Sequence, residues 1–428
     1  MSMKLDADAK QNGTRFKLFP QPRFLDGFAE PEIVHINVPT NRIAAGPADD
    51  RMFVIDPLNK LPYEFDLPPF RGPVNVKVEA KNGHFDHLEP GTRAFSCATM
   101  YATVRRVLDI MEDYFGHRIE WHFRADFARM ELIPLIDWDN AQSGYGFLEF
   151  GFGRTPGGAR DFARPYCENF DVLAHELGHS IIFSQVGTPG SNATATADYG
   201  GFHESAGDLV ALIASLHFDT MIDKLLARTR GNLFTANELT RVGELSASRQ
   251  IRVAFNDTRM SDVGDEPHDR SLPLTGAIFD VMVEVFQKGL VAKGLITQDL
   301  ADRANNGPGQ GVSTEALQAE FSQAHGDNAA GFRATLLEAR DYLGRLLARA
   351  WSSIGPDNLS YHDVLVALLD ADREQTGGAH QETIRSCFQW RQITLPPHRA
   401  SQLMHRYRVS DCAGQAHRTA DLVEPAHT

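Results

Sequence analysis

The stretch His175-Glu176-Leu177-Gly178-His179 carries two histidines and a glutamate in the order H-E-x-x-H. Apolar residues continue at helical spacing on both sides, in Phe170–Ala174 and Ser180–Phe183, which predicts that the stretch lies on a helix. Because residues four apart share one face of a helix, both imidazoles can reach the same metal ion. The pattern is typical of a zinc site in which the glutamate acts on a metal-bound water.

A zinc ion that acts in catalysis usually has three protein ligands, so the two histidines need a partner. A second H-x-x-G-x-x-H arm is excluded, because the chain has Ile182 and Gln185 where that arm would need a glycine and a histidine. The next candidate is Glu204, which shares one face of the amphipathic segment Gly201–Ile213 with Asp208. We expect Glu204 to bind zinc and Asp208 to accept a hydrogen bond from a ligand histidine, which fixes the tautomer of that histidine.

These two segments resemble those of the thermolysin-like (gluzincin) zinc metallopeptidase family. The family places H-E-x-x-H on one helix and N-E-x-x-x-D on the next, and here His203 stands where that asparagine often stands. Asp171–Ala174 is similar to the residues that precede the family motif, and a weaker likeness runs from about residue 94 to about residue 392. The resemblance implies an α+β fold with a β-containing N-terminal lobe, a mainly helical C-terminal lobe and the zinc helix between them.

The resemblance also implies a place for a peptide substrate. Asn140 and Ala141, followed by Tyr145–Gly151, are similar to the substrate-binding edge strand of the family. In that strand the asparagine side chain and the alanine carbonyl hold the peptide backbone by strand addition. We therefore expect Asn140 and Ala141 to bind substrate.

Further substrate contacts are expected downstream. His268 is the best match for the family histidine that donates a hydrogen bond to the oxyanion of the tetrahedral intermediate. A tyrosine shares that role in the family, and Tyr199 is the nearest tyrosine before Glu204. Arg249 and Arg252 compete for the role of the arginine that holds a substrate carbonyl, and the sequence leaves both open.

The chemistry that these residues predict is zinc-dependent hydrolysis of a peptide bond. One Zn2+ ion would lower the pKa of a bound water to about 7 and polarise the scissile carbonyl. Glu176 would act as general base and pass the proton to the leaving amine. Cleavage inside a peptide, by an endopeptidase, is the first expectation.

Two other functions stay open. An aminopeptidase would need an anchor for the α-amino group of the substrate, and the sequence has no G-x-M-E-N-like motif to supply one. The other alternative is a non-catalytic, zinc-bound protein that binds peptides or serves as a scaffold. Retention of Glu176 argues against it, because a purely structural zinc site has no use for a general base.

Calcium is a second metal to consider, because the family often holds calcium behind the zinc helix. Asp171 stands where one calcium ligand would be. The partner carboxylate would fall near Ser215, which cannot serve, so calcium is not expected at this double site. Asp171 is instead expected to stabilise the N-terminus of its helix.

Composition narrows the class of protein and its partners. With 42% hydrophobic and 23% charged residues, the 428-residue chain has the composition of an ordinary globular protein. A net charge of −14 disfavours nucleic acid and anionic membrane surfaces as partners and leaves a peptide or protein substrate. No segment is apolar enough to span a membrane and no apolar signal sequence is visible, which favours a cytoplasmic location. The oligomeric state is left open.

Periodicity divides the chain into four regions: 1–85 with short strands, 86–190 with the zinc helix at its end, 191–395 with the third ligand, and a tail 396–428. Strands are expected at Ile33–Val38, Met52–Ile55 and Val74–Val78 and within 131–153. Helices are expected at 96–115 with Ser96 as N-cap, and at 170–186, 202–228, 273–294, 313–324, 327–353 and 360–372. The small residues of 187–201 predict a loop, either a lid over the cleft or a solvent loop between two helices.

Overall fold

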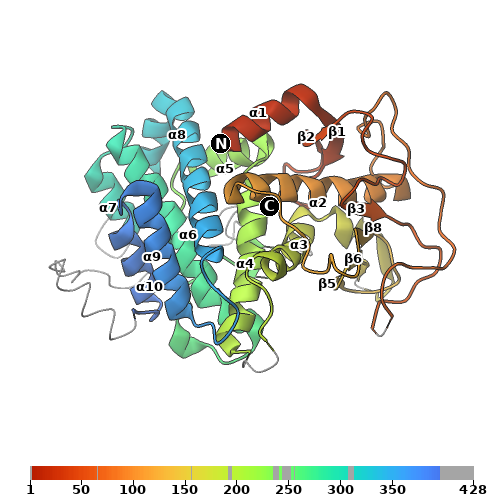
Figure 1. Ribbon diagram of the computed structural model, residues 1–428. Helices are drawn as coiled ribbons and strands as arrows, with labels where there is room; N and C mark the ends of the chain where they lie inside the picture. Colours follow the sequence, from red (N-terminus) through yellow and green to blue (C-terminus); the bar gives the residue numbers. More distant parts are fainter. Residues whose placement is uncertain are drawn as a thin grey trace.

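The computed structural model describes residues 2–64, 66–155, 157–190, 195–234, 241–242, 252–254, 256–306 and 313–395 (Figure 1). The tail predicted at 396–428 lies outside these ranges. The first helices are α1 (Ser2–Asn12), α2 (Arg93–Phe115), η1 (Tyr166–Glu168), α3 (Phe170–Gln185), α4 (Ala197–Ser215) and α5 (Asp219–Thr229). They are followed by η3 (Met260–Asp262), α6 (Pro267–Ala292), α7 (Gln298–Asn306), α8 (Thr314–Trp351), α9 (Tyr361–Thr376) and α10 (Gln381–Trp390).

The strands are short and form small sheets. They are β1 (Gly13–Leu18), β2 (Glu32–Pro39), β3 (Met52–Val54), β4 (Met130–Ile133), β5 (Ala141–Gly144), β6 (Phe147–Phe150), β7 (Phe152–Arg154), β8 (Arg160–Pro165), β9 (Arg241–Val242) and β10 (Arg252–Val253). Four of them form one sheet in the order β3-β4-β6-β5, in which β5 runs antiparallel to β6 and the other two pairs are parallel. Within the described part of the chain, β5 is therefore an edge strand.

The arrangement is α+β, as the sequence predicts. Figure 1 shows β3, β5, β6 and β8 on one side of the molecule and the bundle of α6, α8, α9 and α10 on the other. The helices α3 and α4 lie between these two groups. The two segments that carry the expected metal ligands therefore meet in the middle of the fold.

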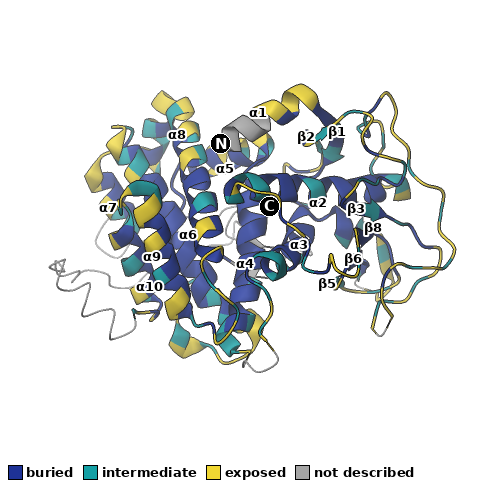
Figure 2. Ribbon diagram, in the orientation of Figure 1, coloured by how far each residue is buried: buried dark blue, intermediate teal, exposed yellow. Residues whose placement is uncertain are grey.

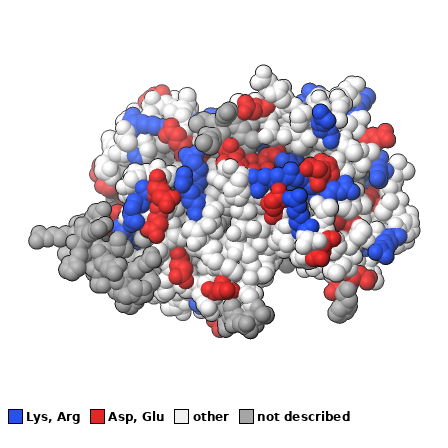
Figure 3. All heavy atoms as spheres, in the orientation of Figure 1, with Lys and Arg blue, Asp and Glu red and all other residues white. Residues whose placement is uncertain are grey.

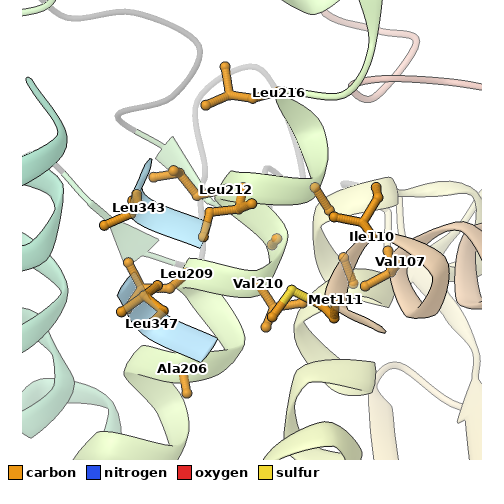
Figure 4. Packing of buried hydrophobic residues seen from close by; sticks show 14 of the residues in the cluster. Val107, Ile110, Met111, Ala206, Leu209, Val210, Leu212, Leu216, Leu343 and Leu347 are labelled. Atoms are coloured by element: carbon orange, nitrogen blue, oxygen red, sulfur yellow. The ribbon is translucent and has the colours of Figure 1, made fainter. Parts of the chain in front are cut away.

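Helix α4 is enclosed on two sides by other helices. Figure 4 shows Leu209 and Leu212 of α4 beside α8, and Val210 beside Met111 of α2, and all four side chains are at most 4% exposed. In Figure 2 the same region is almost entirely buried. Because the hydrophobic contribution grows with the apolar area removed from water, these two contacts stabilise the position of α4 from both sides.

The C-terminus of α4 is fixed by buried arginines, and this ends the helix early. Arg340 donates to the carbonyl of Leu216 over 3.0 Å, and Arg106 donates to the carbonyl of His217 over 2.7 Å. The carboxylate of Glu32 then accepts bonds from two backbone N–H groups at the start of α5, at 3.2 and 2.9 Å. Since these groups satisfy the exposed helix ends, two helices form where the sequence predicts one at 202–228, and that prediction is wrong.

The helix predicted at 96–115 is present, but its N-cap differs. It begins at Arg93, because the hydroxyl of Thr92 accepts a bond from Phe95 N over 3.1 Å. Ser96 lies inside the helix and donates to the carboxylate of Glu168 over 2.7 Å. Thr92 and Ser96 both have a hydroxyl that suits an N-cap. Because Ser96 bonds the distant carboxylate of Glu168, Thr92 caps the helix.

Three further predictions have mixed outcomes. The expected strands Ile33–Val38 and Met52–Ile55 are confirmed as β2 and β3. The helices expected at 313–324 and 327–353 form one element, α8, with a kink at Asn328, whose φ of −143° is not helical. The strand expected at Val74–Val78 is wrong, because Val76 is 93% exposed and the segment makes only isolated bridges.

Surface charge is mixed. On the face shown in Figure 3, Lys and Arg side chains lie in groups together with Asp and Glu side chains. Among the described residues, no helix combines the length and apolar character that crossing a bilayer requires. The visible face therefore offers no extended basic surface of the kind that binds nucleic acid.

A strap, defined as residues 57–64 and 66–70, covers the face of the four-stranded sheet that points away from α3. Glu131 of β4 and Glu149 of β6 are both 0% exposed on that face. Lys60 forms an ion pair with Glu149, which also accepts a bond from Gln142 of β5. Tyr63 donates its hydroxyl to Glu131 over 2.8 Å and its backbone N–H to Glu149 over 2.7 Å. The strap thereby holds the edge strand β5 from behind.

Replacement of Lys60 tests how strongly the strap holds the sheet. Lys60→Met leaves Glu149 buried without its cation, and we expect a loss of about 3–5 kcal/mol in the free energy of unfolding. The double variant Lys60→Met/Glu149→Gln should recover most of that loss, because no uncompensated charge is left. Arg124→Met removes an ion pair with Glu120 that is more than half exposed, and should cost about 1 kcal/mol or less. Urea unfolding followed by circular dichroism measures all three, and equal losses for Lys60→Met and Arg124→Met would contradict the assignment.

Candidate metal centre

Helix α3 carries the H-E-x-x-H stretch and begins at a well-capped end. The side chain of Asn169 accepts a bond from the backbone N–H of Val172, which caps the helix. Asp171 lies in the first turn, where its negative charge stabilises the N-terminus of the helix. Both of its carboxylate oxygens accept from Gln21 Nε2, at 3.3 and 3.1 Å. Ser215 stands where the second carboxylate of a calcium site would be expected. Its hydroxyl donates to the carbonyl of Leu212 over 2.8 Å.

Two glycines bring α3 and α4 into backbone contact. A Cβ atom added to Gly178 would lie 2.7 Å from the Cα of Gly207. A Cβ atom added to Gly207 would lie 2.6 Å from Nδ1 of His175. Real Cβ atoms do not approach other atoms this closely, so only glycine fits at either position without a shift. The close crossing sets the distance between the two histidines on α3 and the carboxylate on α4.

The ligand atoms of His175, His179 and Glu204 converge. His175 Nε2 lies 3.3 Å from one oxygen of Glu204, and His179 Nε2 lies 3.7 Å from the other. The three ligand atoms lie within 4.8 Å of one another. Ligands of a tetrahedral zinc ion at about 2.0–2.1 Å from the metal are about 3.4 Å apart. Two imidazoles and one carboxylate at these separations can hold a single metal ion of this geometry.

The second nitrogen of His175 has a fixed partner. Its Nδ1 lies 2.9 Å from Oδ1 of Asp208, whose side chain is 1% exposed. The carboxylate accepts a hydrogen bond from Nδ1–H, so in a singly protonated imidazole the proton lies on Nδ1. The lone pair of Nε2 then points toward Glu204, as a metal ligand requires.

His203 contacts the second nitrogen of His179, a role that the sequence analysis did not predict for it. The two Nδ1 atoms are 2.8 Å apart, and the rings are stacked with centroids 5.1 Å apart. Burial lowers the pKa of His203 to about 4, so its ring is neutral and one nitrogen can accept. If Nδ1 of His179 donates, Nε2 of His179 is left as a ligand. The position directly before Glu204 was the sequence signal for this contact.

His268 lies beside the same carboxylate. Helix α6 begins at Pro267, six residues before the predicted start at 273, because Glu266 caps it through the N–H of Asp269. The Nδ1 atom of His268 contacts Glu266 over 2.6 Å, and Nε2 lies 3.5 Å from an oxygen of Glu204. The side chain is 58% exposed, so it borders the centre from the solvent side.

One side of α3 stays open to solvent next to the ligands. Glu176, His179 and Phe183 are half-buried, whereas the residues between Phe170 and Ile182 on the other sides of the helix are buried. Positions 176 and 183 are seven residues apart and therefore lie on nearly the same line along the helix. Glu176 thus faces the accessible space next to the ligand cluster.

The edge strand β5 borders this open side. Ser143 of β5 and Ser180 of α3 share a hydrogen bond of 2.9 Å between their hydroxyls. The carbonyl of Asn140 accepts from Gly151 N over 3.0 Å, so its backbone faces β6. Because backbone groups alternate along an antiparallel strand, those of Ala141 and Ser143 point to the free edge. The side chain of Asn140 is exposed.

The remaining expected contacts are placed differently. The hydroxyl of Tyr199 donates to the carbonyl of Gly187 over 2.8 Å, and burial raises its pKa to about 12. Arg249 lies outside the described residues, and of Arg252 the structure describes only the main chain, in β10. The loop predicted at 187–201 ends earlier, because α4 begins at Ala197 with Thr196 as its N-cap. Thr196 Oγ1 donates to the carbonyl of Leu359, in the segment before α9. Residues 191–194 of that loop lie outside the description.

No protein-family model and no curated protein matches the sequence. Among solved structures, the chain is similar to the precursor of protealysin, a metalloproteinase from Serratia proteamaculans, at 13% sequence identity and a TM-score of 0.44. The alignment covers 84% of this chain and 91% of that chain. Function is therefore inferred from the geometry of the candidate metal centre itself.

Gly207→Ala tests the helix crossing. The added methyl would meet the ring of His175, so either the ring or α4 must move, and we expect zinc affinity to fall about 10–100-fold. Competition with a chromophoric chelator measures the affinity. Gly326→Ala is the control, because a methyl at that helical glycine of α8 meets nothing within 4 Å. Unchanged affinity in Gly207→Ala would show that the close crossing does not set the ligand geometry.

Asp208→Ala tests the support of His175. Without the carboxylate, Nδ1 of His175 loses its acceptor, so the productive tautomer is no longer favoured and zinc affinity should fall about 10–100-fold. Isothermal titration of the metal-free protein measures this. Asp302→Ala, at an exposed aspartate of α7, is the matched control and should bind zinc as the wild type does. Equal affinities in the two variants would contradict the role.

Proposed function

We propose that this protein is a zinc-dependent endopeptidase with the two-lobe architecture of the thermolysin-like family. The observation that carries the proposal is the convergence of His175, His179 and Glu204 from two neighbouring helices, with their ligand atoms within 4.8 Å. Glu176 supports it further, because a carboxylate on the accessible line beside such a cluster suits a general base. The donor set fits zinc, since imidazole and carboxylate are its usual ligands at catalytic sites.

The chain's own residues would divide the chemistry between them. When bound, zinc would lower the pKa of a water molecule and polarise the substrate carbonyl. The carboxylate of Glu176 would accept a proton from the attacking water and deliver it to the nitrogen of the leaving amine. With both ring nitrogens protonated, His268 would donate from Nε2 to the oxyanion, while its Nδ1–H donates to the carboxylate of Glu266.

Substrate would bind along β5. An extended peptide can add to an exposed sheet edge through backbone hydrogen bonds, and Ala141 and Ser143 direct their backbone groups to that edge. The exposed side chain of Asn140 would also hold the peptide backbone. Tyr199 would act only after its bond to Gly187 opens, so His268 is the first candidate for the oxyanion contact. Of the two arginines, neither is preferred.

Cleavage of a mixed peptide library by the zinc-loaded protein tests the proposal. Wild type should cut inside peptides, and Glu176→Gln should lose at least about 1000-fold in rate, because its amide cannot take the proton. Zinc content, measured by mass spectrometry, should be equal in both. Glu315→Gln, at an exposed glutamate of α8, is the control and should cut as the wild type does.

The products also separate the alternatives. Release of N-terminal residues alone would favour an aminopeptidase over an endopeptidase. Zinc and peptide binding without any cleavage would overturn hydrolysis and favour a binding or scaffold protein. Loss of zinc binding in Glu204→Gln with the fold retained would support the ligand set independently of activity.

A further inference from the structure

A series of aromatic rings connects the metal centre to the end of the edge strand. His203 stacks on the ligand His179 and lies 4.2 Å, between centroids, from Phe183. Phe183 in turn lies 5.2 Å from His122, which lies 5.5 Å from Tyr145, the residue after β5. We name Phe183, His122 and Tyr145 the aromatic wall. Its rings come from α3, from the turn before β4 and from the turn after β5.

The wall lies on the same side of α3 as Glu176. Phe183 follows Glu176 by seven residues, which is two turns, so the two side chains lie on nearly one line about 10.5 Å apart along the axis. Both are half-buried, and Tyr145 is 41% exposed. The wall is therefore reached from the same accessible space as the general base.

Hydrogen bonds fix how β5 runs beside α3 (Figure 1). Ser143 bonds Ser180, and the backbone N–H of His122 donates to Ser184 over 3.1 Å. Ser143 therefore lies beside Ser180, and Tyr145, which packs on His122, lies near Ser184. The strand and the helix thus run in the same direction. Two strand residues and four helix residues cover similar distances, about 6–7 Å, so Ala141 lies level with Glu176.

This register places the wall against one end of a bound peptide. Antiparallel pairing, the more stable arrangement per residue, would put the N-terminal part of the peptide at the Tyr145 end of β5. A distance of about 10.5 Å corresponds to about three residues of extended chain. The wall would therefore meet a side chain two or three residues before the cleaved bond.

The chemistry of the wall selects the kind of side chain. Burial lowers the pKa of His122, so its ring is neutral near pH 7 and presents an aromatic surface. Rings gain from offset or edge-to-face contacts with other rings. The hydroxyl of Tyr145 donates to the carboxylate of Asp126 over 2.6 Å, and this nearby carboxylate disfavours an acidic side chain.

We propose that the aromatic wall of Phe183, His122 and Tyr145 is a specificity subsite that selects an aromatic side chain two or three residues before the cleaved bond. The inference rests on the proposed endopeptidase function and adds to it the class of substrate. No contact of the wall with the reacting bond is required, so its residues should affect the choice of peptide and not the chemical step. Variants of the wall should therefore lower the preference for an aromatic side chain at that position.

Peptides that differ only at the second and third positions before the cleaved bond test the subsite. For wild type we expect kcat/KM to be about tenfold higher with phenylalanine than with alanine at one of these positions, and lowest with aspartate. Phe183→Ala should reduce the phenylalanine preference to about threefold or less. Tyr145→Ala should reduce the preference in the same way. Because the side chain of Tyr145 is 41% exposed, its truncation leaves the core intact. Phe162→Ala, at a phenylalanine that is 62% exposed on the β7–β8 hairpin, is the matched control and should keep the preference.

The outcomes of this test separate the subsite from the function itself. If wild type cuts and Glu176→Gln does not, while the wall variants keep the wild-type preference, the function stands and the subsite is overturned. A preference that appears only after the cleaved bond also overturns it. If wild type cuts no peptide, the proposed function fails and the subsite fails with it. Zinc content is measured in each variant, and loss of preference in Tyr145→Ala with full zinc content supports the subsite.

Discussion

The backbone contact between α3 and α4 is the constraint on which the metal centre depends. Gly178 and Gly207 let the two helices approach so closely that a methyl group at either position would collide with the opposite helix or with His175. The histidines of α3 and the carboxylate of α4 are then within reach of one ion without any long side chain having to stretch. Packed interiors resist small shifts, so this crossing also limits how far the ligands can drift apart.

The surroundings of α4 hold that crossing in place. Apolar side chains anchor the middle of the helix to α2 and α8, and two buried arginines fix its C-terminal carbonyls. Behind each candidate ligand histidine stands a further polar group from α4, Asp208 for His175 and His203 for His179. Both groups belong to the helix that also carries Glu204, so one rigid element carries one candidate ligand and the partners of the other two.

The sequence predicted the α+β class, most helices and the residues that converge, because H-E-x-x-H and the pair Glu204 and Asp208 follow helical spacing. Their roles stay predictions. The sequence did not reveal features that depend on residues far away in the chain. The break after α4 follows from Arg340 and Arg106, which are far away in the chain. The contact of His203 with His179 appears only once two helices are placed together, and a hydroxyl such as that of Tyr199 shows its partner only in three dimensions.

The free edge of β5 has a consequence for how the molecule behaves at high concentration. An open strand edge can accept a peptide, but it is equally a template for a strand from a second copy. Here the edge has four residues, ends at Gly144 and is backed by the strap and by α3. Such a short ladder gives few backbone bonds, so joining two copies edge to edge gains little, whereas a peptide also gains contacts beyond the strand. The shortness of β5 thus limits aggregation through this edge.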